Sequence, residues 1–187
     1  MASVAHLAVG LAAGRIHARA LGWSAAVYVG LSMLPDADVV AFALDIPYSA
    51  PWGHRGASHS PLIALAVGML AGALARPLGQ PVLRTFVLST LVVASHGLLD
   101  TLTDGGLGVA LLWPFEHTRF FAPWQPIPVS PIGLGFLSSR GLEIAAFETF
   151  WSLPLWCVAF WPRKSGKAQG SSPSGETHPP LQNGMSS

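Results

Sequence analysis

Long apolar runs are the feature of this sequence that most restricts its fold. Five of them, separated by polar or Pro/Gly-rich stretches, span residues 4–14, 22–34, 61–75, 82–99 and 142–161. Only 10% of all residues are charged, against about 25% in an ordinary soluble domain. The sequence therefore predicts an all-α, multi-pass transmembrane bundle of about five helices. A soluble helical protein with an unusually apolar surface is the alternative.

Several runs are shorter than the ~20 residues that a helix needs to cross a bilayer. Small residues let helices pack closely, and a thinned bilayer or partly sunk bundle can accommodate short helices. Residues 39–50 are too broken to span and are interpreted as an interfacial or re-entrant piece. Residues 101–140 are rich in Gly, Pro and aromatic side chains, which predicts an irregular outer loop. We expect a membrane domain over 1–162 and a disordered polar tail over 163–187.

The basic residues predict how the bundle is oriented. A secretory signal peptide carries its positive charges before the apolar run, whereas Arg15 and Arg19 follow it. With the N-terminus outside, seven of the ten Lys and Arg residues fall on the inner side: Arg15, Arg19, Arg76, Arg84, Arg163, Lys164 and Lys167. The positive-inside rule therefore favours this orientation and a cytoplasmic C-terminal tail.

Acidic residues and histidines gather at the opposite, outer ends of four predicted helices. They are His6, Asp36, Asp38, His54, His59, His96 and Asp100. The predicted orientation depends on Lys and Arg alone, so this convergence on one face is an independent indication that these residues form a common site.

These residue types favour a divalent metal site. His96 and Asp100 are four residues apart, which places them on one face of a helix. Imidazoles suit zinc and similar ions, and carboxylates can bridge two metals. The single cysteine, Cys157, rules out a thiolate cluster within the chain. We therefore expect one or two divalent ions, zinc or alternatively manganese.

The predicted ligands are His6, Asp36, His54, His59, His96 and Asp100. Arg55 and Asp38 are the predicted catalytic residues, Arg55 to steady developing negative charge. Structural roles are the alternatives: His6 can pack between helices, Asp36 and Asp38 can cap a helix, and His96 with Asp100 can form a buried hydrogen-bonded pair. Ser60 is expected to cap the helix that begins at Pro61, and Glu148 is a weaker site candidate.

The motifs that carry these residues resemble those of the YdjM family. They are His6, Leu34-Pro35-Asp36-Ala37-Asp38, His54-Arg55-Gly56-Ala57-Ser58-His59-Ser60, Ser95-His96-Gly97-Leu98-Leu99-Asp100-Thr101 and Leu111-Leu112-Trp113-Pro114-Phe115. The resemblance runs from about His6 to Pro131. It implies a bacterial inner-membrane protein of a family described as metal-dependent hydrolases.

The function expected from the sequence is metal-dependent hydrolysis of an ester or phosphoester at the outer face of the membrane. Membrane lipids are expected partners, and a lipid headgroup is one candidate substrate. The alternative is a non-catalytic membrane protein with a structural metal or a polar cluster. A transport path is disfavoured because the polar residues gather at one end. The net charge of +1 indicates no nucleic-acid partner.

Overall fold

The computed structural model of the chain describes residues 3–18, 22–131 and 133–162. Within these ranges the fold is all-α, as predicted, and the β-pairing consists of two isolated bridges. The α-helices are α1 (Ser3–Ala18), α2 (Trp23–Met33), α3 (Val40–Ala43), α4 (Pro61–Ala75), α5 (Val82–Thr101), α6 (Ser139–Trp151) and α7 (Leu153–Phe160). Three short 3-10 helices are η1 (Leu34–Val39), η2 (Ala57–His59) and η3 (Gly133–Leu137). The predicted tail over 163–187 lies outside the described residues.

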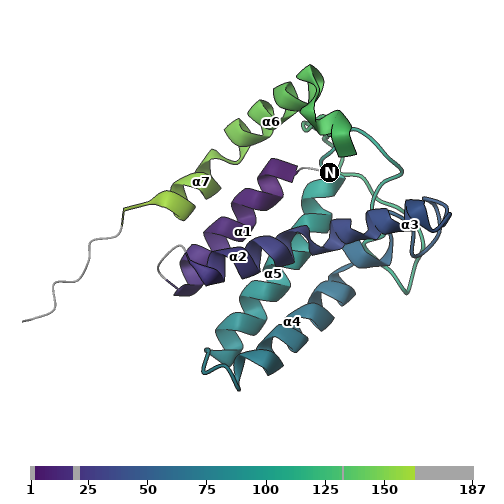
Figure 1. Cartoon of the computed structure of the whole chain (residues 1–187). Coiled ribbons are helices and arrows are strands. Elements are labelled where there is room, and N and C mark those ends of the chain that lie inside the picture. Colours follow the sequence, from purple (N-terminus) through teal and green to yellow (C-terminus); the bar gives the residue numbers. More distant parts are fainter. Residues whose placement is uncertain (1–2, 19–21, 132, 163–187) are drawn as a thin grey trace, which may run out of the picture.

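Two close helix pairs form the body of the molecule. α1 packs on α2 and α4 packs on α5, while α5 also contacts α1 and α2, and α7 lies along α1 (Figure 1). Gly10 and Gly14 allow the first pair to approach, because a Cβ at either would meet the backbone of α2. Gly68 and Gly72 do the same on α4, where they face α5. Such small residues four apart are a common device of helices packed in membranes.

Ser60 begins α4 as predicted: its hydroxyl accepts a hydrogen bond from the backbone nitrogen of Ile63 at 3.3 Å. Pro61 follows at the first helical position, where a missing N–H is harmless. This cap fixes where the chain turns into α4, directly after His59.

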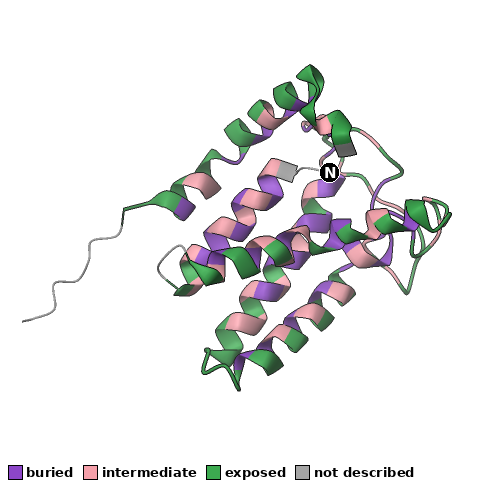
Figure 2. Cartoon of the chain, in the orientation of Figure 1, coloured by how far each residue is buried: buried purple, intermediate pink, exposed green. Residues whose placement is uncertain are grey.

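Burial in the described residues runs opposite to that of a soluble protein. His6, His96 and Asp100 are fully buried, whereas Leu70 and Leu83 are 61% and 73% exposed. Figure 2 shows exposed positions along the outward faces of α4 and α5. Apolar surface on this scale in water would drive aggregation, whereas lipid tails would solvate it. The burial pattern therefore supports a membrane protein.

Two helical stretches are long and apolar enough to cross a membrane, Trp23–Ala43 and Val82–Thr101. The pair α6 and α7, bent by 68°, makes a third if it forms one span. α1 and α4 have 16 and 15 residues, short of a full span. The two or three candidate spans do not confirm five, which stay a prediction.

Two helix boundaries differ from the sequence-based expectation. The second run was expected to stop at Pro35, but the chain continues through η1 into α3. Pro35 lies at the start of the 3-10 helix, where its missing N–H breaks no bond. The last apolar run is broken at Ser152, two residues before Pro154, which cannot donate to the preceding turn.

The predicted irregular loop is present between α5 and η3, and its outer location stays a prediction. Two bridges, Thr103 with Ile127 and Val109 with Phe120, fold it back on itself. Arg119 fastens it to the segment before η2, donating to the carbonyls of His54, Tyr48 and Ala50 at 3.0, 2.7 and 3.1 Å. The loop therefore has a defined shape above the ends of the helices.

Candidate metal centre

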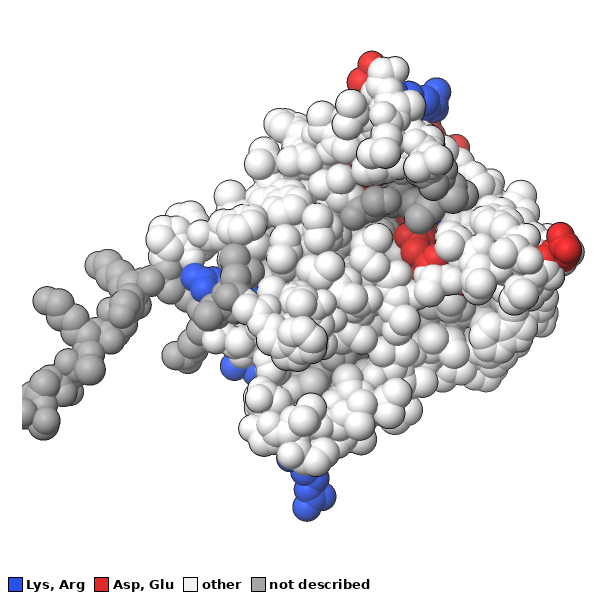
Figure 3. Space-filling model, in the orientation of Figure 1, with Lys and Arg blue, Asp and Glu red and all other residues white. Residues whose placement is uncertain are grey.

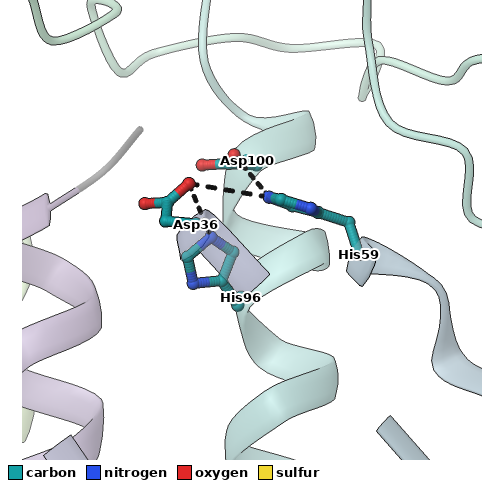
Figure 4. Close-up of side chains that lie close together, drawn as sticks. All are labelled: Asp36, His59, His96 and Asp100. Atoms are coloured by element: carbon teal, nitrogen blue, oxygen red, sulfur yellow. Dashed lines mark ion pairs between the residues drawn. The ribbon is translucent and has the colours of Figure 1, made fainter. Parts of the chain in front are cut away.

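Three separate elements bring four of the predicted ligands together at one end of the bundle. α5 contributes His96 and Asp100 from its last two turns, η1 contributes Asp36, and η2 contributes His59 (Figure 4). These four residues form a group whose ligand atoms all lie within 4.8 Å of one another. We call this group the central cluster.

The imidazole nitrogens and carboxylate oxygens of the central cluster lie close to one another. Oδ1 of Asp36 lies 3.3 Å from Nε2 of His96 and 3.7 Å from Nε2 of His59. The same His59 nitrogen is 3.5 Å from Oδ2 of Asp100. The four residues are between 0% and 6% exposed, so water does not compensate these polar atoms freely.

The tautomer of His96 is set by the backbone of α2. Its Nδ1 lies 2.7 Å from the carbonyl oxygen of Ser32 and must carry a proton to donate there. Nε2 of a neutral imidazole then presents a lone pair to the Asp36 carboxylate. Neither Nε2 of His96 nor either oxygen of Asp36 has a hydrogen-bond partner. Two acceptors that face each other in a buried site need a proton or a metal ion between them.

The spacing suits a divalent ion. Zinc binds imidazole nitrogen and carboxylate oxygen at about 2.0–2.2 Å, so two ligands at a tetrahedral angle lie about 3.3–3.6 Å apart. The three separations of 3.3, 3.5 and 3.7 Å fall at or near that range. Two imidazoles and two carboxylates are also a donor set that zinc or manganese accepts. The central cluster therefore fits a divalent ion.

Asp38 lies beside the central cluster, and both of its oxygens accept hydrogen bonds. One oxygen accepts from Nδ1 of His54 at 2.6 Å. The other accepts from the backbone nitrogen of Arg55 at 3.0 Å and from the hydroxyl of Ser58 at 2.5 Å. It also lies 3.2 Å from Nδ1 of His59. Asp38 thus holds the Nδ1 side of His59 and leaves Nε2 to face the central cluster, as carboxylates behind metal-binding imidazoles do.

The charge around His59 favours a cation. Burial disfavours the protonated imidazole, but the carboxylates of Asp100, Asp36 and Asp38 outweigh that effect and raise its pKa to about 10. A positive charge is therefore stable between these carboxylates, either as a proton on His59 or as a bound metal ion.

Arg55 is placed against Asp100. Its Nε lies 3.0 Å from Oδ2 of Asp100, and its Nη1 donates to the carbonyl oxygen of Gly105 at 2.8 Å. The side chain is 1% exposed, and its backbone has φ of 60°. These contacts position Asp100; the predicted role of Arg55 in steadying charge on a substrate stays a prediction.

The last two predicted ligands lie at the edges of the central cluster. His6 stacks on His96 with ring centroids 3.7 Å apart, and its Nε2 is 3.4 Å from Oδ1 of Asp100. His54 forms a second candidate group with Asp36 and Asp38. All eight predicted site residues therefore gather in one region. Six of them form the two adjoining groups, and His6 and Arg55 contact Asp100.

Sequence reasoning missed two parts of this site, and it named a third, Glu148, only as a weaker candidate. The Ser32 carbonyl is a backbone group in an apolar run, so no sequence signal marks it. Arg119 stands in no motif, and its contacts with the carbonyls of His54 and Tyr48 arise from the folding of the loop. Glu148, considered a weaker site candidate, has an oxygen 2.7 Å from the backbone nitrogen of Val4, which caps the start of α1. It thereby supports the helix that carries His6.

The fold and the site define a class: an all-helical protein with membrane-type surfaces and a buried His/Asp cluster at one end of the bundle. The chain belongs to the family described as YdjM inner membrane protein, whose model matches residues 1–167. The inner membrane protein YbcI of Escherichia coli (strain K12) is 40% identical over 123 residues, covering 65% of this chain and 71% of that protein. No solved structure matches the chain. The predicted family is thereby confirmed, and an inner-membrane location is supported.

Proposed function

We propose that this protein is a membrane-bound, metal-dependent hydrolase of an ester or phosphoester, with its site at the outer face. The observation that carries the proposal is the convergence of unpartnered buried atoms: Nε2 of His59, Nε2 of His96 and both oxygens of Asp36. An arrangement that serves packing alone would leave these groups uncompensated.

The residues divide into distinct roles. The central cluster would hold the ion, with His6 beside it. A divalent ion in this position supplies a Lewis acid that activates water and polarises an ester or phosphoryl group. Asp38 and the Ser32 carbonyl orient the two imidazoles, and Arg55 orients Asp100. His54, held by Asp38 with its ring centroid 5.9 Å from that of His59, is the candidate proton acceptor beside the ligands.

The charge distribution supports the proposed orientation. In Figure 3 most visible basic side chains lie along the lower and left edges, whereas acidic ones lie toward the top and right. One acidic group lies in a hollow of an otherwise uncharged surface. A broad uncharged band separates the two ends. We infer five membrane-inserted segments, short ones included, with the cluster toward the outside and the C-terminal tail in the cytoplasm.

A structural metal is the second candidate function, and one observation favours it. Every residue of the central cluster is buried, and Asp36 is the most accessible of them at 6% exposure. Structural sites are closed, whereas catalytic sites keep a position open to water. Exchange of coordinated solvent distinguishes the two, because a closed site has none to exchange.

Metal analysis tests the proposal first. Detergent-purified wild-type protein should carry about one equivalent or more of zinc or manganese, and an Asp36→Ala, His96→Ala double variant should carry none while keeping its helical circular-dichroism spectrum. With the metal reconstituted, hydrolysis of bis(4-nitrophenyl) phosphate or 4-nitrophenyl acetate should be measurable. A wild type that binds no metal even with excess ion would overturn the hydrolase and the structural-metal functions alike.

A further inference from the structure

The outer loops that cover the central cluster expose large apolar side chains. We call residues 44–56 and 102–138 the roof. Among its described side chains, Phe115 is 89%, Leu134 is 87% and Trp124 is 63% exposed. Trp52, in the segment before η2, is 59% exposed. A loop layer in water normally exposes polar side chains, so this surface calls for an apolar or amphipathic surround.

The apolar surface of the roof continues into that of the helices. The ring of Trp124 lies edge-on to Trp151 of α6 with centroids 5.6 Å apart, and Trp151 is itself 47% exposed. Trp52 makes a similar edge contact with Trp113 at 5.3 Å. Tryptophans of this kind sit at the level of lipid headgroups, where one part of the ring is apolar and the other wet. The roof therefore has the side chains that are typical of a membrane–water interface.

The charges of the roof would not attract a soluble anion. Its exposed charged residues are all acidic: Asp45, Asp104 and Glu116. Its two arginines are engaged elsewhere, Arg55 with Asp100 and Arg119 with the carbonyls of the neighbouring segment. A free phosphoester in water would meet net repulsion at this surface. Apolar contact with a lipid tail would bring a phosphoester there in spite of the charge.

The position of the central cluster along the helices also favours a substrate that comes from the membrane. Asp36 follows α2, His59 precedes α4, and His96 and Asp100 lie in the last turns of α5. Three of the four candidate ligands are thus at helix ends, where the phosphates of a bilayer lie. Asp36 meets them from inside the candidate span Trp23–Ala43, seven residues before its end.

We propose that the roof lies in the outer headgroup layer and that the substrate is a phosphoester of a membrane lipid whose tails stay in the bilayer. This inference rests on the proposed hydrolase function. In the reaction, the oxygen of water bonds to phosphorus and the bond from phosphorus to the leaving oxygen breaks. One proton of the water passes to the leaving oxygen, and the other is released from the new phosphate acid.

The test compares a soluble and a lipid phosphoester on the zinc-loaded full chain. The soluble probe is bis(4-nitrophenyl) phosphate, and the lipid probe is phosphatidylglycerol or phosphatidylethanolamine in mixed micelles of varied lipid fraction. The rate on lipid should rise with the surface fraction of lipid. Leu134→Ser should lower kcat/KM on lipid at least tenfold and leave the soluble probe within twofold. Leu78→Ser, at the α4–α5 turn and 72% exposed, is the matched control and should change neither.

A measurement without activity places the roof independently. A nitroxide on Phe115→Cys, in a Cys157→Ser background, should be reached by oxygen and shielded from a water-soluble nickel complex in nanodiscs. Strong exposure to the nickel complex would overturn the roof placement. Hydrolysis of the soluble probe without lipid hydrolysis would overturn the lipid substrate and leave the hydrolase standing. Bound metal with neither probe hydrolysed would overturn both.

Discussion

Asp36 and Asp38 lie two residues apart on η1, yet the structure gives them opposite surroundings. Oδ1 of Asp36 faces the imidazoles of His96 and His59, and neither oxygen of Asp36 has a hydrogen-bond partner. Asp38 accepts from His54, from Ser58 and from the backbone of Arg55, and it lies against His59. A carboxylate without donors is suited to bind a cation, whereas one with all its acceptor sites occupied is suited to orient its neighbours. The comparison teaches that two like residues in one motif take different roles.

The largest expected effect is the loss of metal when Asp36 is removed. Asp36→Ala deletes the carboxylate that both imidazole nitrogens approach, so bound zinc should fall from about one equivalent to under a tenth. Elemental analysis after dialysis against a weak chelator measures it. Glu116→Ala, an exposed carboxylate of the outer loop, is the control and should keep its metal. Retention of metal by Asp36→Ala would place the ion elsewhere.

A smaller loss is expected when Asp38 is changed without altering its size. Asp38→Asn keeps the shape but weakens its hold on the Nδ1 protons of His54 and His59, so metal affinity should fall about 10- to 100-fold. A competition titration with a chromogenic chelator gives the dissociation constant. If Asp38→Asn instead abolished binding as completely as Asp36→Ala, Asp38 would be a ligand and the contrast between the two carboxylates would disappear.

The stability of the metal-free protein should depend on pH through His59, which lies between Asp36 and Asp38. The pKa of His59 is raised to about 10, above its ordinary value of 6.5. A raised pKa contributes stability that is fully present below pH 6.5 and is lost as the pH rises toward 10. The melting temperature of chelator-treated protein in detergent should therefore fall across that window. Zinc-loaded protein should show a much smaller fall, because the metal replaces the proton.

The same proton competes with the metal, so zinc affinity should weaken as the pH falls from 8 to 6. Titrations at fixed ionic strength measure this slope in the wild type and in Asp38→Asn. The loss of one of three carboxylates around His59 should make the slope shallower in the variant. Equal slopes would mean that Asp38 does not act on His59.

The smallest expected effect concerns the helix cap beside the cluster. Ser60→Ala removes the acceptor for the backbone nitrogen of Ile63 and should lower the free energy of unfolding by about 1 kcal/mol. Chemical denaturation in detergent measures it, and metal content should stay unchanged. Loss of metal would show that the start of α4 and the position of His59 cannot be separated.

Much of the fold was predictable because the pattern that determines it is local. The apolar runs predicted the helices over residues 61–75 and 82–99 within a few residues of α4 and α5. Boundaries set by a single residue were less accessible. Pro35 suggested an end of helix, but it stands where a 3-10 helix tolerates it. Pro154 bends the last run, which hydropathy alone reads as continuous.

The sequence by itself determined which residues form the buried His/Asp cluster of this protein. Imidazoles and carboxylates are rare in so apolar a chain, and the charge pattern of Lys and Arg places them at one end of the helices. Tertiary structure alone decided their roles. The Ser32 carbonyl directs His96, Asp38 directs His59, and Arg55 is turned toward Asp100. The reason is physical: a hydrogen bond depends on where distant backbone and side-chain atoms meet, and helix packing sets those positions over separations of up to 64 residues.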